Sequence, residues 1–159
     1  MQQSAIKAAQ DMAAKVVNNL GGYGIFGVEF FVAGGEVIFS ELSPRPHDTG
    51  MVTMASQALS QFDLHARAIM GLPIPTEMDV CPAASAVILA DRDSSQFTFT
   101  GLAEALADHP EDTDIRIFAK PVTRPYRRMG VALANGADTD EARARAFKAA
   151  STVQIHYKD

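Results

Sequence analysis

Two glutamates stand inside apolar segments that are typical of β-strands. Glu29 lies within GIFGVEFFV and Glu41 lies within VIFSEL. A carboxylate that is buried without a partner is costly, so such residues are usually paired, bound to a metal or placed at the wall of a cleft. Two carboxylates on adjacent strands would offer hard oxygen ligands, which suit magnesium together with phosphate oxygens. In the alternative interpretation, each glutamate points to solvent from the polar face of a half-buried sheet.

The turn between the two segments decides whether the glutamates share a face. Gly34-Gly35 separates them, which predicts a β-hairpin. A two-residue turn would pair Glu29 with Ser40 and place the two acids on opposite faces. A three-residue turn would pair Glu29 directly with Glu41, at about 5.5 Å or less between Cα atoms. Two like charges at that distance are destabilising unless a cation lies between them.

The segment SPRPHDTG, residues 43–50, follows directly on the second glutamate. Prolines on both sides of Arg45 restrict the backbone, so its guanidinium could be presented to a carboxylate or phosphate at little entropic cost. Asp48 could accept a hydrogen bond from a substrate amine, or it could belong to a turn that caps a helix. His47 has no second histidine at zinc-ligand spacing, so we expect no zinc site here.

A basic cluster stands near the end of the chain, in the segment KPVTRPYRR. Lys120, Arg127 and Arg128 flank this proline-containing loop in an otherwise acidic protein. Such a group can bind a phosphate dianion through charge-assisted hydrogen bonds. The alternative is a solvated basic loop with no ligand.

The hydrophobic pattern predicts an α+β fold. Apolar residues recur at helical spacing over 3–20 and 51–70, with glycines at the end of each segment, and the hairpin strands are expected over about 24–33 and 36–42. The proline-rich segment GLPIPTEMDVCP then favours a domain boundary, so we expect domains at residues 1–72 and 73–159. In the second domain we expect strands in ASAVILA, QFTFTG, DIRIFAK, MGVALAN and VQIHY, and helices in LAEALAD and DEARARAFKAA.

Composition narrows the classes of function. The chain has 159 residues and a net charge of −5, which argues against a nucleic-acid binder with a broad basic surface. Its single cysteine, Cys81, excludes an internal disulfide framework. No apolar run is long enough to span a membrane and the N-terminal residues lack an apolar signal core, so we expect a cytoplasmic protein.

The segments quoted above, taken together, resemble a known enzyme family. GVEFFV and VIFSELSPRPHDTGMVT are similar to the end of an ATP-grasp domain. CPAASAVIL, RIFAKP and RRMGVALA are similar to the small C-terminal domain of the formate-dependent phosphoribosylglycinamide formyltransferases, the folate-independent GAR transformylases. The resemblance therefore implies the C-terminal part of an ATP-grasp domain over residues 1–72, followed by a small mixed α/β domain. The ATP-dependent aminoimidazole ribonucleotide carboxylases are a sibling family, in which the loop after the histidine typically reads Asn-Ser-Gly-His rather than Asp48-Thr49-Gly50-Met51.

The resemblance implies roles for the candidate residues. Glu29 and Glu41 would hold Mg²⁺ against the phosphates of ATP, which is a co-substrate. Asp48 would meet the amine of glycinamide ribonucleotide, and its 5′-phosphate would be bound by three cations, Lys120, Arg127 and Arg128. Arg45 would stabilise an acyl phosphate or contact the substrate.

The implied reaction has two steps. ATP phosphorylates formate to formyl phosphate, and the glycinamide amine then attacks that acyl phosphate and releases phosphate. The family also implies a homodimer that acts on small molecules, and the net charge and the absence of a long apolar run argue against nucleic acid and a membrane as partners. Because the family's lid and ATP-clamp residues have no counterpart in these 159 residues, the adenine-binding residues are unknown and we expect the isolated chain to be inactive. The carboxylase sibling and a non-catalytic binding module stay open as alternatives.

Overall fold

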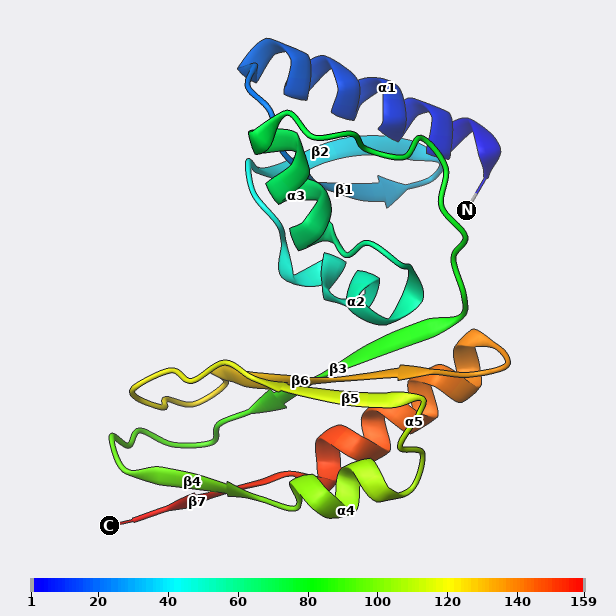
Figure 1. Cartoon of the computed structure of the whole chain (residues 1–159). Coiled ribbons are helices and arrows are strands. Elements are labelled where there is room, and N and C mark those ends of the chain that lie inside the picture. The colour runs from blue at the N-terminus through cyan, green and yellow to red at the C-terminus, as the bar shows by residue number, and fades with distance from the viewer. Residues whose placement is uncertain (1, 159) are drawn as a thin grey trace. The chain divides into compact units, whose positions relative to one another are not determined.

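The computed structural model describes residues 2–158, which form two compact units (Figure 1). The first unit contains the chain up to residue 51 together with residues 59–77. The second contains residues 52–58 and the chain from residue 78 onward. The short segment 52–58 thus packs with the later part of the chain.

The first unit is built on a helix and a hairpin. Helix α1 (Gln3–Leu20) runs along the antiparallel strands β1 (Gly27–Ala33) and β2 (Glu36–Ser43) and contacts both (Figure 1). The helix ends at Gly21, whose positive φ of 75° suits a residue without Cβ. The predicted helix over 3–20 and the predicted hairpin are therefore confirmed.

The single helix predicted over residues 51–70 is wrong. The chain forms a 3₁₀ turn η1 (Asp48–Val52), a short helix α2 (Thr53–Ser56) and a separate helix α3 (Gln61–Met70). The break follows from capping: the extended Ser60 accepts a hydrogen bond from the Asp63 N–H, and the Asp63 carboxylate accepts one from the Ser60 N–H. This capping box starts a new helix at a point where hydrophobic spacing alone predicts continuity.

The second unit is an antiparallel sheet with helices packed on it. Its strand order is β3 (Ala83–Leu89), β6 (Arg128–Asn135), β5 (Thr113–Ile117), and helix α5 (Thr139–Thr152) packs against all three strands. A second pair joins β4 (Phe97–Thr100) to β7 (Gln154–Tyr157), and helix α4 (Leu102–Ala107) packs on α5. Every strand and helix predicted for this region is confirmed.

Small side chains set the packing distance between α5 and the sheet. Ala134 of β6 packs with Ala142 and Ala146 of α5 in one buried cluster. Alanine side chains occupy little volume in the interface and lose no rotamer freedom on burial, so the helix can lie close to the strands. At the far end, a Cβ on Gly101 would lie 2.2 Å from the Thr152 carbonyl oxygen, so only glycine allows α4 to approach the end of α5.

The fold class is α+β, as predicted. Among the helices of residues 2–158, none is both long and apolar enough to cross a membrane.

Candidate functional site

The two glutamates are cross-strand partners in the hairpin. The turn contains only Gly34-Gly35, since Ala33 pairs with Glu36. Continued without interruption, that register would pair Glu29 with Ser40. A β-bulge beside Glu29 absorbs Ser40 as an extra residue, and Glu29 pairs with Glu41 instead. The juxtaposition thus arises from a two-residue turn plus a bulge, and the three-residue turn considered above does not form.

Glu29 has a neighbour in the loop that follows the hairpin, and Glu41 has one in Ser43, the last residue of β2. The His47 Nε2 atom lies 3.4 Å from a carboxylate oxygen of Glu29, whose side chain is 42% exposed. Glu41 is exposed and accepts a hydrogen bond from the Ser43 hydroxyl at 3.2 Å. Neither carboxylate is therefore a buried, neutralised group, and both keep oxygen lone pairs that a cation could use.

This donor set fits magnesium better than a transition metal. Within residues 2–158 there is no group of three or more histidine, cysteine, aspartate or glutamate side chains placed to hold a metal ion. Mg²⁺ commonly takes one or two protein carboxylates and completes its shell with water and substrate phosphates. Two paired carboxylates match that habit, whereas a zinc site would need three or four protein ligands.

His47 links the hairpin to the loop that follows it. Its Nε2 atom faces Glu29, and its Nδ1 atom lies 3.1 Å from an Asp48 carboxylate oxygen and 3.0 Å from the Thr49 hydroxyl. The ring is mostly buried, with 16% of the side chain exposed. One imidazole therefore joins a predicted metal ligand to a predicted substrate ligand, which the sequence analysis missed because the contact depends on the path of the loop.

Gln61 fixes the backbone of His47 from the start of α3. The buried Gln61 amide accepts a hydrogen bond from the His47 N–H at 3.1 Å and donates one to the His47 carbonyl at 2.7 Å. Two glycines make room for this arrangement. A Cβ on Gly27 would lie 2.7 Å from His47 Cβ, and a Cβ on Gly50 would lie 2.2 Å from Gln61 Oε1. Gly27 begins β1 and Gly50 ends the loop, but glycine is too common at such positions for the sequence to predict the contact between Gln61 and His47.

Arg45 and Asp48 are the two residues of the loop for which the sequence predicts contact with a substrate. Arg45 is exposed and donates a hydrogen bond to the neighbouring Pro46 carbonyl at 2.9 Å. Asp48 begins the 3₁₀ turn η1, with its side chain 30% exposed. The predicted roles of Arg45 and Asp48 towards a substrate stay predictions.

The predicted cations gather at one cavity of the second unit. This cavity has a volume of about 690 Å³. Its cationic lining residues are Lys120, Arg124, Arg127 and Arg128, and the rest of its lining is Val87, Leu89, Pro125 and Tyr126. Burial lowers the pKa of Lys120 below its usual value, and the neighbouring positive charges of Arg127, Arg128 and Arg124 lower it further. Its ammonium group donates to the Arg128 carbonyl at 2.7 Å. The cavity is a concentration of positive charge, although the net charge of the chain is −5.

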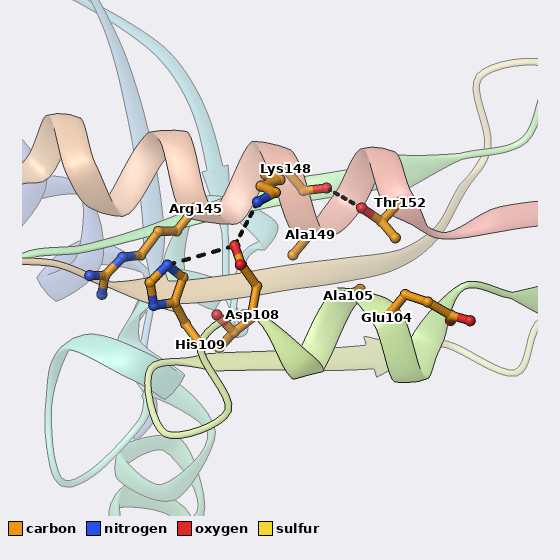
Figure 2. A pocket seen from close by; sticks show the side chains of 9 residues that line it. Glu104, Ala105, Asp108, His109, Arg145, Lys148, Ala149 and Thr152 are labelled. Carbon is orange, nitrogen blue, oxygen red and sulfur yellow. Dashed lines mark hydrogen bonds and ion pairs between the residues drawn. The ribbon is translucent and has the colours of Figure 1, made fainter.

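A second cavity lies between α4 and α5 and has a different character. It measures about 20 Å³, which is room for about one water molecule and too little for a metabolite. Figure 2 shows Asp108 between Lys148 and His109, with Asp108 accepting a hydrogen bond from Lys148 Nζ at 2.7 Å. We interpret this cluster as a structural ion-pair network.

Two family models match different parts of the chain. Residues 1–62 match a family model described as an ATP-grasp domain, and residues 83–153 match one described as "PurT, C-terminal". The formate-dependent phosphoribosylglycinamide formyltransferase of Erythrobacter litoralis is 63% identical over 163 residues, which cover 100% of this chain and 41% of that protein. The chain is therefore similar to the C-terminal portion of the proteins of this formyltransferase family. It spans about two fifths of the length of the relatives it matches.

Other members of the formyltransferase family and solved structures extend the comparison. The relative from Trichormus variabilis is 58% identical over 98% of this chain and 39% of that protein. A glycinamide-RNase-transformylase T from Mycobacterium tuberculosis superposes with a TM-score of 0.76 at 36% identity, over 97% of this chain and 39% of that one. The N5-carboxyaminoimidazole ribonucleotide synthetase of Thermotoga maritima gives 0.83 at 34% identity, over 99% and 44%. The fold is thus shared with the sibling family, and the sequence is nearer to the formyltransferases.

Proposed function

We propose that this chain provides the metal-binding carboxylates and the substrate-phosphate cations of an ATP- and formate-dependent glycinamide ribonucleotide formyltransferase. The observation that carries the proposal is the cross-strand pairing of Glu29 and Glu41, in a chain that is 63% identical to a formate-dependent phosphoribosylglycinamide formyltransferase. Two facing carboxylates are costly unless a cation joins them, and their arrangement suits Mg²⁺ with a nucleotide phosphate.

The proposed chemistry assigns each group a task. A carboxylate oxygen of formate attacks the γ-phosphorus of ATP, ADP leaves, and formyl phosphate forms. The glycinamide amine then attacks the formyl carbon, phosphate leaves, and the amine loses a proton. Mg²⁺, held by Glu29 and Glu41, would supply charge neutralisation on the phosphates. Asp48 would accept a hydrogen bond from the amine and orient it, and Arg45 would contact the acyl phosphate or the substrate.

The second unit contributes the anchor for the substrate. Lys120, Arg127 and Arg128 would bind the 5′-phosphate in the cationic cavity, where a phosphate dianion relieves their mutual repulsion. Binding energy at this remote phosphate would hold the amine in position for the transfer step.

A chimera tests the proposal directly. The matching C-terminal portion of the Erythrobacter litoralis enzyme is replaced by this chain, and ATP- and formate-dependent formylation of glycinamide ribonucleotide is measured. We expect activity in the chimera and none in the 159-residue chain alone. Glu29→Gln and Glu41→Gln should each lower kcat/KM by about a hundredfold or more. Glu36→Gln, which removes the same charge at the hairpin turn, is the matched control and should leave activity unchanged. An inactive but folded chimera, or equal effects of all three variants, would contradict the proposal.

The carboxylase sibling is a second candidate, favoured by the TM-score of 0.83 with the Thermotoga maritima synthetase. The same chimera is assayed with bicarbonate and aminoimidazole ribonucleotide in place of formate and glycinamide ribonucleotide. ATP turnover that depends on bicarbonate would support the sibling activity, whereas turnover that depends on formate would exclude it.

We also propose a homodimer that acts in the cytoplasm on small molecules only. The family resemblance supports the dimer and the compartment, and the net charge of −5 argues against nucleic acid as a partner. Light scattering on the purified protein tests the dimer, and a monomeric mass would refute it.

A further inference from the structure

The cationic cavity contains one arginine more than the family resemblance implies. Arg124 lines it together with Lys120, Arg127 and Arg128, and no acidic side chain is among the lining residues in the described part of the chain. Arg124 also lies near enough to Lys120 to help lower the pKa of that lysine. Four cations around one cavity repel each other, and an anion with two negative charges relieves that repulsion better than a single charge.

The segment that carries Lys120 and Arg124 is bounded by two residues with a strained backbone conformation. Within residues 2–158, Ala119 and Tyr126 are the only non-glycine residues with positive φ, at 51° and 63°. They flank the stretch from Lys120 to Pro125. A positive φ at a residue other than glycine costs about 1–3 kcal/mol, and this conformation persists only where the surrounding structure enforces it. Such strain clusters at ligand-binding loops, because it presets the positions of the side chains.

Hydrogen bonds to neighbouring segments enforce this conformation. The Tyr126 N–H donates to the Ala90 carbonyl at 2.8 Å, and the Thr123 N–H donates to the Ser94 carbonyl at 2.7 Å. Thr123 is buried, with 3% of its surface exposed. Since Arg124 directly follows this buried anchor, its backbone is fixed although its side chain is exposed.

We propose that Arg124 is a further ligand of the phosphomonoester bound in this cavity and donates hydrogen bonds to the phosphate directly. The identity of the substrate rests on the proposed function. That the cavity binds a phosphate group rests on the cavity alone. Within residues 2–158, the Arg124 guanidinium makes no hydrogen bond or ion pair, so all its donors are available. By contrast, Lys120 and Arg127 each already donate to a backbone carbonyl, at 2.7 and 3.1 Å.

Two roles for Arg124 give different results. As a direct ligand, it offers two parallel N–H groups to two phosphate oxygens, which lysine cannot reproduce. As a distant positive charge, it would only attract the anion, lysine would replace it fully, and salt would screen the effect.

The test is calorimetric binding of ribose 5-phosphate to the 159-residue chain, with ribose as the unphosphorylated control. We expect Arg124→Gln to raise Kd about tenfold, the effect of one charge-assisted contact. Arg124→Lys should restore only part of the affinity, and the difference should persist at about 0.5 M salt. Arg143→Gln is the matched control, because Arg143 is a highly exposed arginine of α5 that pairs with Asp140 and does not line the cavity. Circular dichroism confirms that each variant is folded.

Other results of the binding measurement would overturn the inference about Arg124. A Kd for Arg124→Gln within about twofold of the wild-type value would overturn the inference, and so would full restoration by Arg124→Lys with loss of the effect in salt. If Arg124→Gln binds normally while the chimera transfers formyl groups, only this inference fails and the proposed function stands. If the wild-type chain does not bind ribose 5-phosphate, the inference fails together with the proposed phosphate site.

Discussion

At the scale of single residues, His47 is the side chain on which the first unit's candidate site depends. Its two ring nitrogens lie 3.4 Å from Glu29 and 3.1 Å from Asp48. Groups that orient metal-binding side chains commonly change metal affinity by about 10–100-fold when they are removed. His47→Asn in the chimera should therefore raise the Mg²⁺ concentration for half-maximal activity and the KM for glycinamide ribonucleotide, each by about tenfold.

The control for this variant is His156→Asn, which changes an exposed histidine that bonds Thr100 in the second unit. Steady-state kinetics at varied Mg²⁺ separate the two roles that the geometry assigns to His47. An unchanged Mg²⁺ requirement with lower stability would mean that the imidazole serves only the packing of the loop. The sequence predicted both acids that His47 contacts, because an acidic residue in an apolar strand or a rigid loop is conspicuous. It could not predict the contact itself, which depends on Gln61, a residue fourteen positions later.

At the scale of elements, local signals predicted most boundaries and failed where two signals competed. The helix Gln3–Leu20 has a continuous amphipathic pattern and ends at a glycine, so nothing contradicts its spacing. The region 51–70 has a similar spacing, but the capping box at Ser60 interrupts it. The bulge at Ser40 is a comparable case, because an extra residue in one strand leaves no mark in a pattern of alternating residues.

An ion pair joins the end of α4 to α5, between Asp108 and Lys148. Lys148 lowers the pKa of Asp108 below its ordinary value of 3.8, first through their hydrogen bond and then through its charge, and His109 adds a smaller effect. A carboxyl whose pKa is lower in the folded state stabilises the fold fully above its unfolded pKa, and this contribution is lost as the pH falls through the lowered value. Asp108→Asn should therefore lower Tm slightly at pH 7, and the difference from wild type should vanish at pH values well below about 3.8.

Thermal melts followed by circular dichroism between neutral and acidic pH measure this difference. Asp79→Asn, in the segment that precedes β3, removes the same charge away from the ion-pair network and is the matched control. A difference between Asp108→Asn and wild type that stays constant down to acidic pH would show that lost packing, not the ion pair, is responsible.

At the scale of the whole molecule, the two units differ in how much apolar surface each one buries. Ala5 and Leu64 are the buried hydrophobic residues found in the described part of the first unit, and the other thirteen belong to the second. Several large side chains of the hairpin stay exposed, with Phe31 at 65% and Ile38 at 46%. Since burial of apolar surface is the main stabilising contribution, the first unit should open far more easily than the second.

Hydrogen–deuterium exchange on the 159-residue chain tests this difference. We expect the amides of β1 and β2 to exchange at least about a hundredfold faster than those of β6, the central strand of its sheet, which is buried from Met129 to Ala134. In the chimera, the hairpin should become protected while β6 changes little, because the ATP-grasp sequence supplied by the relative would cover the exposed apolar side chains. Strong protection of the hairpin in the chain alone would contradict this view, since it would require an apolar contact, such as a second copy of the chain, over Phe31 and Ile38.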